Sequence, residues 1–176
     1  MMNRFAYDEV VYHGKVATVH RVGLRMPDGK VVPRDFIHHS GAAVVLPVLE
    51  NGDIVLIRNY RFTVDEHLLE LPAGILEDGE NPLACAAREL KEETGYTAGQ
   101  IEQLCWFYST PGCTDEVIHA YLATQLTDGT QKLERYEDIT VDVLTDDEVR
   151  KMVFDGRIHD GKTVAALAMY WLMKGD

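Results

Sequence analysis

Cysteine is scarce in this chain, with three residues among 176, at Cys85, Cys105 and Cys113. Disulfide frameworks of small domains use an even number of cysteines, and zinc clusters use closely spaced pairs. The three cysteines are odd in number and have no CxxC spacing. We therefore expect neither a disulfide framework nor a zinc site, and interpret the three as buried or incidental thiols.

The chain also lacks a long apolar run. No stretch approaches the roughly 20 apolar residues that a membrane-spanning helix needs. The first ten residues, MMNRFAYDEV, lack the apolar core of a signal peptide. We therefore expect a cytoplasmic protein with no membrane partner.

Positive charge is in short supply. Lysine and arginine total 17 against 29 aspartates and glutamates, which gives a formal net charge of −12. Nucleic-acid binding relies on a basic surface that releases counterions from phosphates, so we expect no nucleic-acid partner. An anionic small molecule would have to be bound locally, by a metal ion and selected arginines.

The length of the chain suits one main domain with a small appendage. Strands are expected at residues 10–12, 16–22 and 30–37, with a turn at Pro27-Asp28-Gly29. These strands predict a small antiparallel sheet over residues 1–40, followed by a main domain over residues 41–176.

The main domain mixes strands and helices. Asn51-Gly52-Asp53 lies between two apolar runs and indicates a hairpin. Strands are expected at 42–48, 54–57, 101–108, 117–123 and 139–144, and helices at 81–94, 146–154 and 162–173. This order predicts an α/β fold, specifically an α/β/α sandwich with a mixed sheet.

The expected helix at 81–94 carries a cluster of glutamates. Asn81 can cap it, Pro82 suits its first position and Gly95 can end it. At about 100° per residue, the carboxylates of the helix fall within an arc of roughly 100°, and they belong to Glu89, Glu92 and Glu93. Like charges at this spacing repel one another, and a hard cation such as Mg²⁺ would relieve the repulsion. Taken alone, such a cluster is usually a solvated acidic face.

The register around the cluster favours function. The pattern reads Gly74, five residues, Glu80, seven residues, Arg88-Glu89-Leu90, one residue, Glu92-Glu93, one residue, Gly95-Tyr96. It resembles the Nudix box, G-x5-E-x7-R-E-U-x-E-E-x-G-U, in which U is a bulky aliphatic residue. The last position departs from that pattern, because Tyr96 replaces an aliphatic residue.

The resemblance extends over nearly the whole chain and is closest to the ADP-ribose pyrophosphatase branch of Nudix hydrolases. The matching segments are Asp28–Val32, Arg58–Arg61, Leu69–Gly74, Ser109–Gly112, Asp115–His119, Glu137–Ile139 and Gly161–Leu167. The resemblance implies a Mg²⁺-dependent enzyme, with Mn²⁺ as a possible substitute, that splits ADP-ribose into AMP and ribose 5-phosphate. The number of metal ions stays open.

The resemblance also implies roles for the residues of the box. Glu89 and Glu93 would bind the metal together with the backbone carbonyl of Ala73. Glu92 would be a third ligand or an acid behind the ligands. Arg88 is expected to pair with Glu80 or Glu92 rather than touch substrate. Supporting roles fall to Gly74, Glu80, Arg88 and Gly95.

The catalytic base is expected on the loop 133–139, because an acidic loop can reach the attacking water without being captured by the metal. Glu137 matches the family's Glu-Asp-Ile element and could bind metal or act in catalysis. Related enzymes often carry an acid two residues earlier, where this chain has Arg135. Glu134 is therefore an alternative base, unless it belongs to a solvated acidic loop.

Substrate recognition is assigned from the same resemblance to Arg58, Arg61, Glu70, Pro111, Gly112 and Glu116. Taken singly, the arginines could be a surface pair and Pro111-Gly112 an ordinary turn. The resembling enzymes are homodimers in which the N-terminal segment crosses to the partner. Phe5, Tyr12 or Phe36 could then stack on adenine, although burial in the dimer core is the more common role for any one such aromatic residue.

Other functions stay open. The substrate could be another nucleoside diphosphate sugar, such as a GDP-sugar, or a dinucleoside polyphosphate. A non-catalytic ADP-ribose-binding sensor is an alternative of a different class. The intact carboxylates and the absence of a DNA-binding appendage after the last expected helix argue against a sensor.

Overall fold

The computed structural model describes residues 4–15 and 17–175, which divide into two compact units. The first unit comprises the chain up to Gly41 together with Tyr108–Val117, and the second comprises Ala42–Phe107 and the chain from Ile118 onward. The return of residues 108–117 to the first unit was not anticipated from the sequence.

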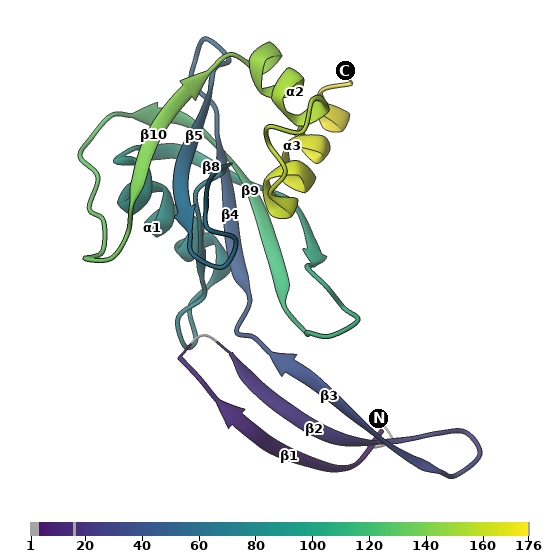
Figure 1. Cartoon of the computed structure of the whole chain (residues 1–176). Helices are drawn as coiled ribbons and strands as arrows, with labels where there is room; N and C mark the ends of the chain where they lie inside the picture. Colours follow the sequence, from purple (N-terminus) through teal and green to yellow (C-terminus); the bar gives the residue numbers. More distant parts are fainter. Residues whose placement is uncertain (1–3, 16, 176) are drawn as a thin grey trace. The chain divides into compact units, whose positions relative to one another are not determined.

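The first unit is an antiparallel sheet of order β1-β2-β3 (Figure 1). Its strands are β1 (Phe5–His13), β2 (Thr18–Arg25) and β3 (Val31–His38). The expected turn joins β2 to β3, with Gly29 at φ 85°. Val16, which was placed in a strand, lies outside the described residues.

The second unit contains two sheets, of order β7-β4-β9-β8 and β10-β5-β6. Their strands are β4 (Ala42–Pro47), β5 (Ile54–Arg61), β6 (Glu66–Glu70), β7 (Ala73–Ile75), β8 (Thr97–Tyr108), β9 (Val117–Thr127) and β10 (Ile139–Leu144). Strand β4 runs parallel to β9 and antiparallel to β7. The mixed sheet expected from the sequence is therefore present.

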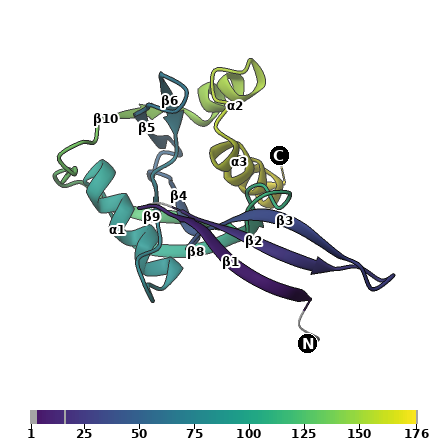
Figure 2. The same cartoon turned by 60° about the horizontal axis from the view of Figure 1, so that its bottom comes forward.

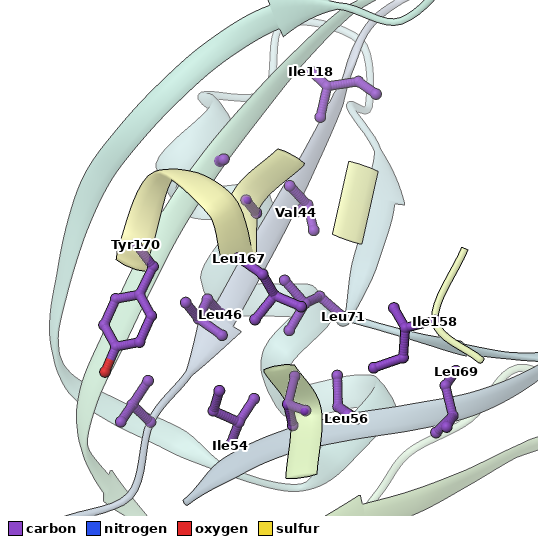
Figure 3. Packing of buried hydrophobic residues seen from close by; sticks show 14 of the residues in the cluster. Val44, Leu46, Ile54, Leu56, Leu69, Leu71, Ile118, Ile158, Leu167 and Tyr170 are labelled. Atoms are coloured by element: carbon purple, nitrogen blue, oxygen red, sulfur yellow. The ribbon is translucent and has the colours of Figure 1, made fainter. Parts of the chain in front are cut away.

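Helices α1 (Pro82–Thr94) and α3 (Gly161–Lys174) lie on opposite sides of β4 (Figure 2). Helix α2 (Asp146–Phe154) contributes Val149 to the same core cluster as α3. Alternate side chains of the fully buried β4 point to opposite layers. Ala43 and Val45 pack in the cluster of α1, and Val44 and Leu46 pack in the cluster that includes Leu167 of α3 (Figure 3). This alternation confirms the mixed α/β fold class. None of the described helices is both long and apolar enough to cross a bilayer.

The prediction of a hairpin at Asn51-Gly52-Asp53 was right for the turn and wrong for the pairing of its two strands. The turn forms, with Gly52 at φ 91°, but β4 and β5 then enter different sheets and only Val48 bridges Ile54. The reason is that β7 and β9 already occupy both edges of β4. Strands β6 and β7, at five and three residues, were not expected from the sequence.

Candidate active site

Helix α1 places two carboxylates one turn apart on its buried side. The helix begins after Asn81 as expected, and Asn81 caps it by accepting a hydrogen bond from Leu83 N–H at 2.9 Å. Glu89 and Glu93 are 9% and 3% exposed, and Glu92 lies on the wetter side. Both buried glutamates line a cavity of about 400 Å³ within the second unit.

The cavity brings together eight of the predicted site residues, which come from β5, β7, α1 and the loop before β10. They are Arg61, Ala73, Gly74, Arg88, Glu89, Glu93, Glu134 and Glu137. Five further lining residues were not predicted: Asn59, Tyr60, Ile75, Glu77 and Tyr136. Tyr60 and Tyr136 lie next to predicted residues, but their sequence context alone gives no sign that they face a cavity.

Glu93 is a buried carboxylate that no cation of the described residues contacts directly. One carboxylate oxygen, Oε2, accepts a hydrogen bond from Ala73 N–H at 2.8 Å. Within residues 4–15 and 17–175, Glu93 is part of no ion pair. Burial raises its pKa to about 8, with further contributions from Glu89 and Glu137 that outweigh Arg61. The site therefore holds more negative charge than its own cations neutralise.

Glu89 sits against the loop that precedes α1. Burial raises its pKa, although the ion pair with Arg88, Nη1 to Oε1 at 2.5 Å, opposes the shift. A Cβ atom at Gly74 would stand 1.8 Å from Glu89 Oε1. A residue larger than glycine at position 74 would therefore force this carboxylate to shift.

Arg88 organises the box as expected. It forms two hydrogen bonds to Glu80, at 2.9 and 3.0 Å, and one to Glu92 at 3.2 Å. The bonds from Arg88 are the main cause that lowers the Glu80 pKa to about 2. Glu80 also accepts from Glu77 N–H at 3.0 Å, which closes the loop before the helix. The contact of Arg88 with Glu89 was not expected.

The donor set fits a hard divalent cation, although the described part of the chain contains no preformed cluster of three or more His, Cys, Asp or Glu for a metal. Oε1 of Glu93 and Oε2 of Glu89 accept no hydrogen bond from the described residues. Both are carboxylate oxygens, which Mg²⁺ prefers, and Mg²⁺ commonly takes only one or two carboxylates and completes its shell with water and phosphate.

The loop before β10 is tied to the end of α1. Gln131 Nε2 donates to the carbonyl of Glu93 at 2.6 Å, and Lys132 N–H donates to the carbonyl of Glu92 at 2.9 Å. Further along, Glu134 N–H donates to the Glu137 carboxylate at 2.7 Å. The Glu137 charge contributes to the raised pKa of both buried glutamates of α1. Glu137 is thus the loop acid coupled to the carboxylate pair.

Two predicted substrate residues are engaged elsewhere in the second unit. Glu70 is fully buried and forms ion pairs with Arg61 and Lys162. Arg58 pairs with Asp142 on β10 at 2.8 Å. Neither Glu70 nor Arg58 lines the cavity, so their contact with substrate stays a prediction, and Lys162 was missed although it lies in a segment that carried the resemblance.

The remaining predicted substrate residues belong to the first unit. Pro111 and Gly112 line a separate cavity of about 330 Å³ that also includes Phe5 and Phe36. The two phenylalanine rings are stacked with centroids 6.5 Å apart. Glu116 faces His39, with an N–O distance of 3.5 Å. The assignment of this group to the ribose end of a substrate stays a prediction.

The comparison with known families identifies the class. Residues 38–167 match the NUDIX domain family. The chain belongs to this family and is a Nudix hydrolase, as the box and the fold had indicated.

The chain is also similar to named relatives over most of its length. The chain is 37% identical over 161 residues to the ADP-ribose pyrophosphatase of Bacillus subtilis (strain 168), covering 90% of this chain and 87% of that protein. Identity and coverage are the same for the methanol dehydrogenase activator of Bacillus methanolicus. The GDP-mannose pyrophosphatase of Escherichia coli (strain SMS-3-5 / SECEC) is 32% identical over 165 residues, covering 85% of each chain.

A solved structure shares the fold. The crystal structure of an ADP compounds hydrolase superimposes with a TM-score of 0.81 and covers 97% of this chain and 94% of its own. Its sequence identity is 22%. At that identity the likeness concerns the fold alone.

Proposed function

We propose that this protein hydrolyses the pyrophosphate of ADP-ribose to AMP and ribose 5-phosphate with the help of Mg²⁺. The observation that carries the proposal is the pair of buried carboxylates, Glu89 and Glu93, at a cavity that also presents the Arg61 guanidinium. This combination suits a cation and a phosphate anion together. The relatives named ADP-ribose pyrophosphatases support the choice of substrate.

Glu89, Glu93 and the carbonyl of Ala73 would hold the metal. A bound divalent cation neutralises phosphate charge and makes a water more acidic. Ala73 N–H, by donating to Glu93, fixes one oxygen of that carboxylate and leaves the other for the cation. Glu92 acts behind these ligands, since its carboxylate pairs with Arg88 and does not line the cavity.

Glu137 is the base we favour. Its carboxylate lines the cavity and is electrostatically coupled to Glu89 and Glu93, whereas Glu134 contributes its backbone N–H to hold Glu137. A carboxylate that lines the cavity without belonging to the metal ligands can accept the proton that the attacking water must lose.

Arg61 would bind the pyrophosphate. Its guanidinium is fixed by two hydrogen bonds to Glu70, at 2.7 and 2.6 Å, and still lines the cavity. A guanidinium offers further N–H donors for phosphate oxygens. Because the arginine is held before substrate arrives, little conformational entropy is lost on binding.

The direct test is to incubate the protein with ADP-ribose and Mg²⁺ and to measure AMP. We expect AMP with Mg²⁺ or Mn²⁺ and none with a chelator. The isosteric variant Glu93→Gln should reduce kcat by at least about 100-fold, because it removes a charged ligand of the cation. No AMP from the wild-type protein would refute the substrate, and full activity of the variant would refute the metal role of Glu93.

A GDP-sugar is the second candidate substrate, favoured by the similarity to GDP-mannose pyrophosphatases. A panel of ADP-ribose, GDP-mannose and a dinucleoside polyphosphate, compared by kcat/KM, separates these possibilities. Turnover of any of them excludes a purely ligand-sensing role.

A further inference from the structure

Four charged side chains form a mostly buried chain of ion pairs that runs from the start of α3 to the cavity. Asp160 Oδ1 accepts from Lys162 Nζ at 3.0 Å, and Lys162 Nζ also donates to Glu70 Oε2 at 2.5 Å. Glu70 holds Arg61 through the two hydrogen bonds described above. Side-chain exposure is 16% for Asp160 and Lys162 and 1% for Glu70, but 38% for Arg61. Only the arginine reaches the cavity.

The register of β5 and β6 shows that Arg61 and Glu70 are offset along the sheet. Glu70 is paired with Ile57 across β5 and β6, so Arg61 lies four residues further along β5. A guanidinium that reaches back along a sheet needs a fixed carboxylate to define its position. Lys162 supplies a second contact to the Glu70 carboxylate, at 2.5 Å, besides the two from Arg61.

Thr163 ties the same turn to the strand end that leads into the site. Its hydroxyl donates to Asp160 at 2.7 Å and accepts from Leu71 N–H at 2.9 Å, and the residue is fully buried. Leu71 stands two residues before Ala73, whose N–H donates to Glu93. Asp160 is also the N-cap of α3 and accepts from Thr163 N–H at 3.0 Å. The first turn of α3 thus contacts two consecutive residues, Glu70, which holds Arg61, and Leu71, which lies two residues before Ala73.

We propose that the first turn of α3 is a positioning device, in which Lys162, balanced by Asp160, fixes Glu70 and through it aims Arg61 into the cavity. Lys162 is a positioning residue that does not itself line the cavity. The expected effect of Lys162 on catalysis rests on the proposed hydrolysis of ADP-ribose. The expected effect of Lys162 on the position of Arg61 does not.

The structural consequence is tested by NMR of the arginine side chains in the full-length protein. The Nε–H of Arg61 donates to Glu70 at 2.7 Å and should therefore exchange slowly with water; its signal is assigned by its loss in Arg61→Met. In Lys162→Met we expect this signal to shift and to exchange at least about tenfold faster. Lys151→Met, which removes a lysine from an exposed position on α2, is the matched control and should leave the signal unchanged. An unchanged Arg61 signal in Lys162→Met would overturn the proposal.

The kinetic consequence is a double-mutant cycle with ADP-ribose. Lys162→Met should lower kcat/KM by about 10- to 100-fold, the effect of misplacing a binding group by about 1 Å. If Lys162 acts through Arg61, the double variant should be no worse than Arg61→Met alone. Additive losses would mean a general structural role and would refute positioning.

A failure of Lys162→Met to fold and a failure of the proposed substrate can each be told apart from a failure of the positioning role. Should Lys162→Met fail to fold, the variant Asp160→Asn/Lys162→Met removes one charge of each sign and is used in both measurements. Should the wild-type protein release no AMP, the proposed substrate fails, while the NMR comparison still decides whether Lys162 positions Arg61.

Discussion

At the scale of single residues, Glu93 is the clearest case of a charged side chain buried at a cost in stability. A carboxylate with a pKa of about 8 in the folded protein, against 4.5 ordinarily, binds its proton more tightly when folded than when unfolded. Its charge therefore opposes folding, and α1 buries it nonetheless.

This gives a pH prediction for the metal-free protein. Below pH 4.5 both states hold the proton and no penalty exists; between 4.5 and about 8 the unfolded state alone releases it, so stability falls as pH rises. Glu93→Gln has no such titration. With a chelator present, we expect Glu93→Gln to have a larger unfolding free energy than wild type. The difference should grow from pH 4.5 to about 8, to the order of a few kcal/mol, and stay constant above that range. Parallel stability curves at pH 5 and pH 8.5 would contradict this.

Gly74 gives a second prediction. Gly74→Ala places a methyl carbon 1.8 Å from the present position of Glu89 Oε1. The two atoms would overlap, so the carboxylate must move. We expect kcat/KM for ADP-ribose to fall by at least about tenfold. Gly161→Ala adds the same methyl where nothing lies within 4 Å and should stay near wild type. Equal activity of the two variants would show that Glu89 need not stay in place.

At the scale of elements, the C-terminal end of α1 is coupled to the loop that carries Glu137. Gly95 caps the helix with φ 83°, and a Cβ there would lie 2.8 Å from the carbonyl oxygen of Gly129. The loop is further held by the carbonyls of Glu92 and Glu93. A glycine that ends a helix therefore also leaves room for the loop that carries Glu137.

The prediction compares two glycines with positive φ. Gly79→Ala meets open space at φ 73° and should cost only the backbone strain, about 1–2 kcal/mol. Gly95→Ala has the same strain and also displaces the loop at Gly129, so it should destabilise more and should lower kcat in addition. Thermal unfolding and kcat for the pair test this, and matching kcat values would mean that the loop is positioned independently of the cap.

At the scale of the whole molecule, the first unit is poor in buried apolar surface. Val22 is the only buried hydrophobic side chain among its described residues, while Tyr7, Val10 and Tyr12 are exposed. A three-stranded sheet with so little core is marginal by itself.

We propose that a second copy of the chain covers this sheet. Light scattering coupled to size exclusion should then give about twice 19.8 kDa. Replacing the exposed Tyr12 and Val10 with threonine, which suits a strand, should shift the mass toward the monomer. A monomeric wild-type protein would refute the dimer.

Most helices and long strands follow from local sequence signals. The caps at Asn81 and Gly95 act on neighbouring residues, so the bounds of α1 could be predicted closely, and with them the face that carries the glutamates. The hairpin failed because the partners of β4 lie some 30 and 75 residues away, beyond any local pattern. Strands β6 and β7 were missed because runs of five and three residues carry too little periodicity to be recognised.

The sequence by itself determined the reaction chemistry expected here, because the Nudix box is a contiguous register on one helix and the loop before it. The tertiary structure alone decided which residues share the cavity. It placed Glu137 at the cavity that Glu89 and Glu93 line. It also turned Glu70 inward to hold Arg61, and it brought Lys162 into contact with Glu70, 92 residues away in the sequence. The physical reason is that a helix fixes neighbours three and four positions apart, whereas ion pairs between distant elements form only once the sheets and helices pack.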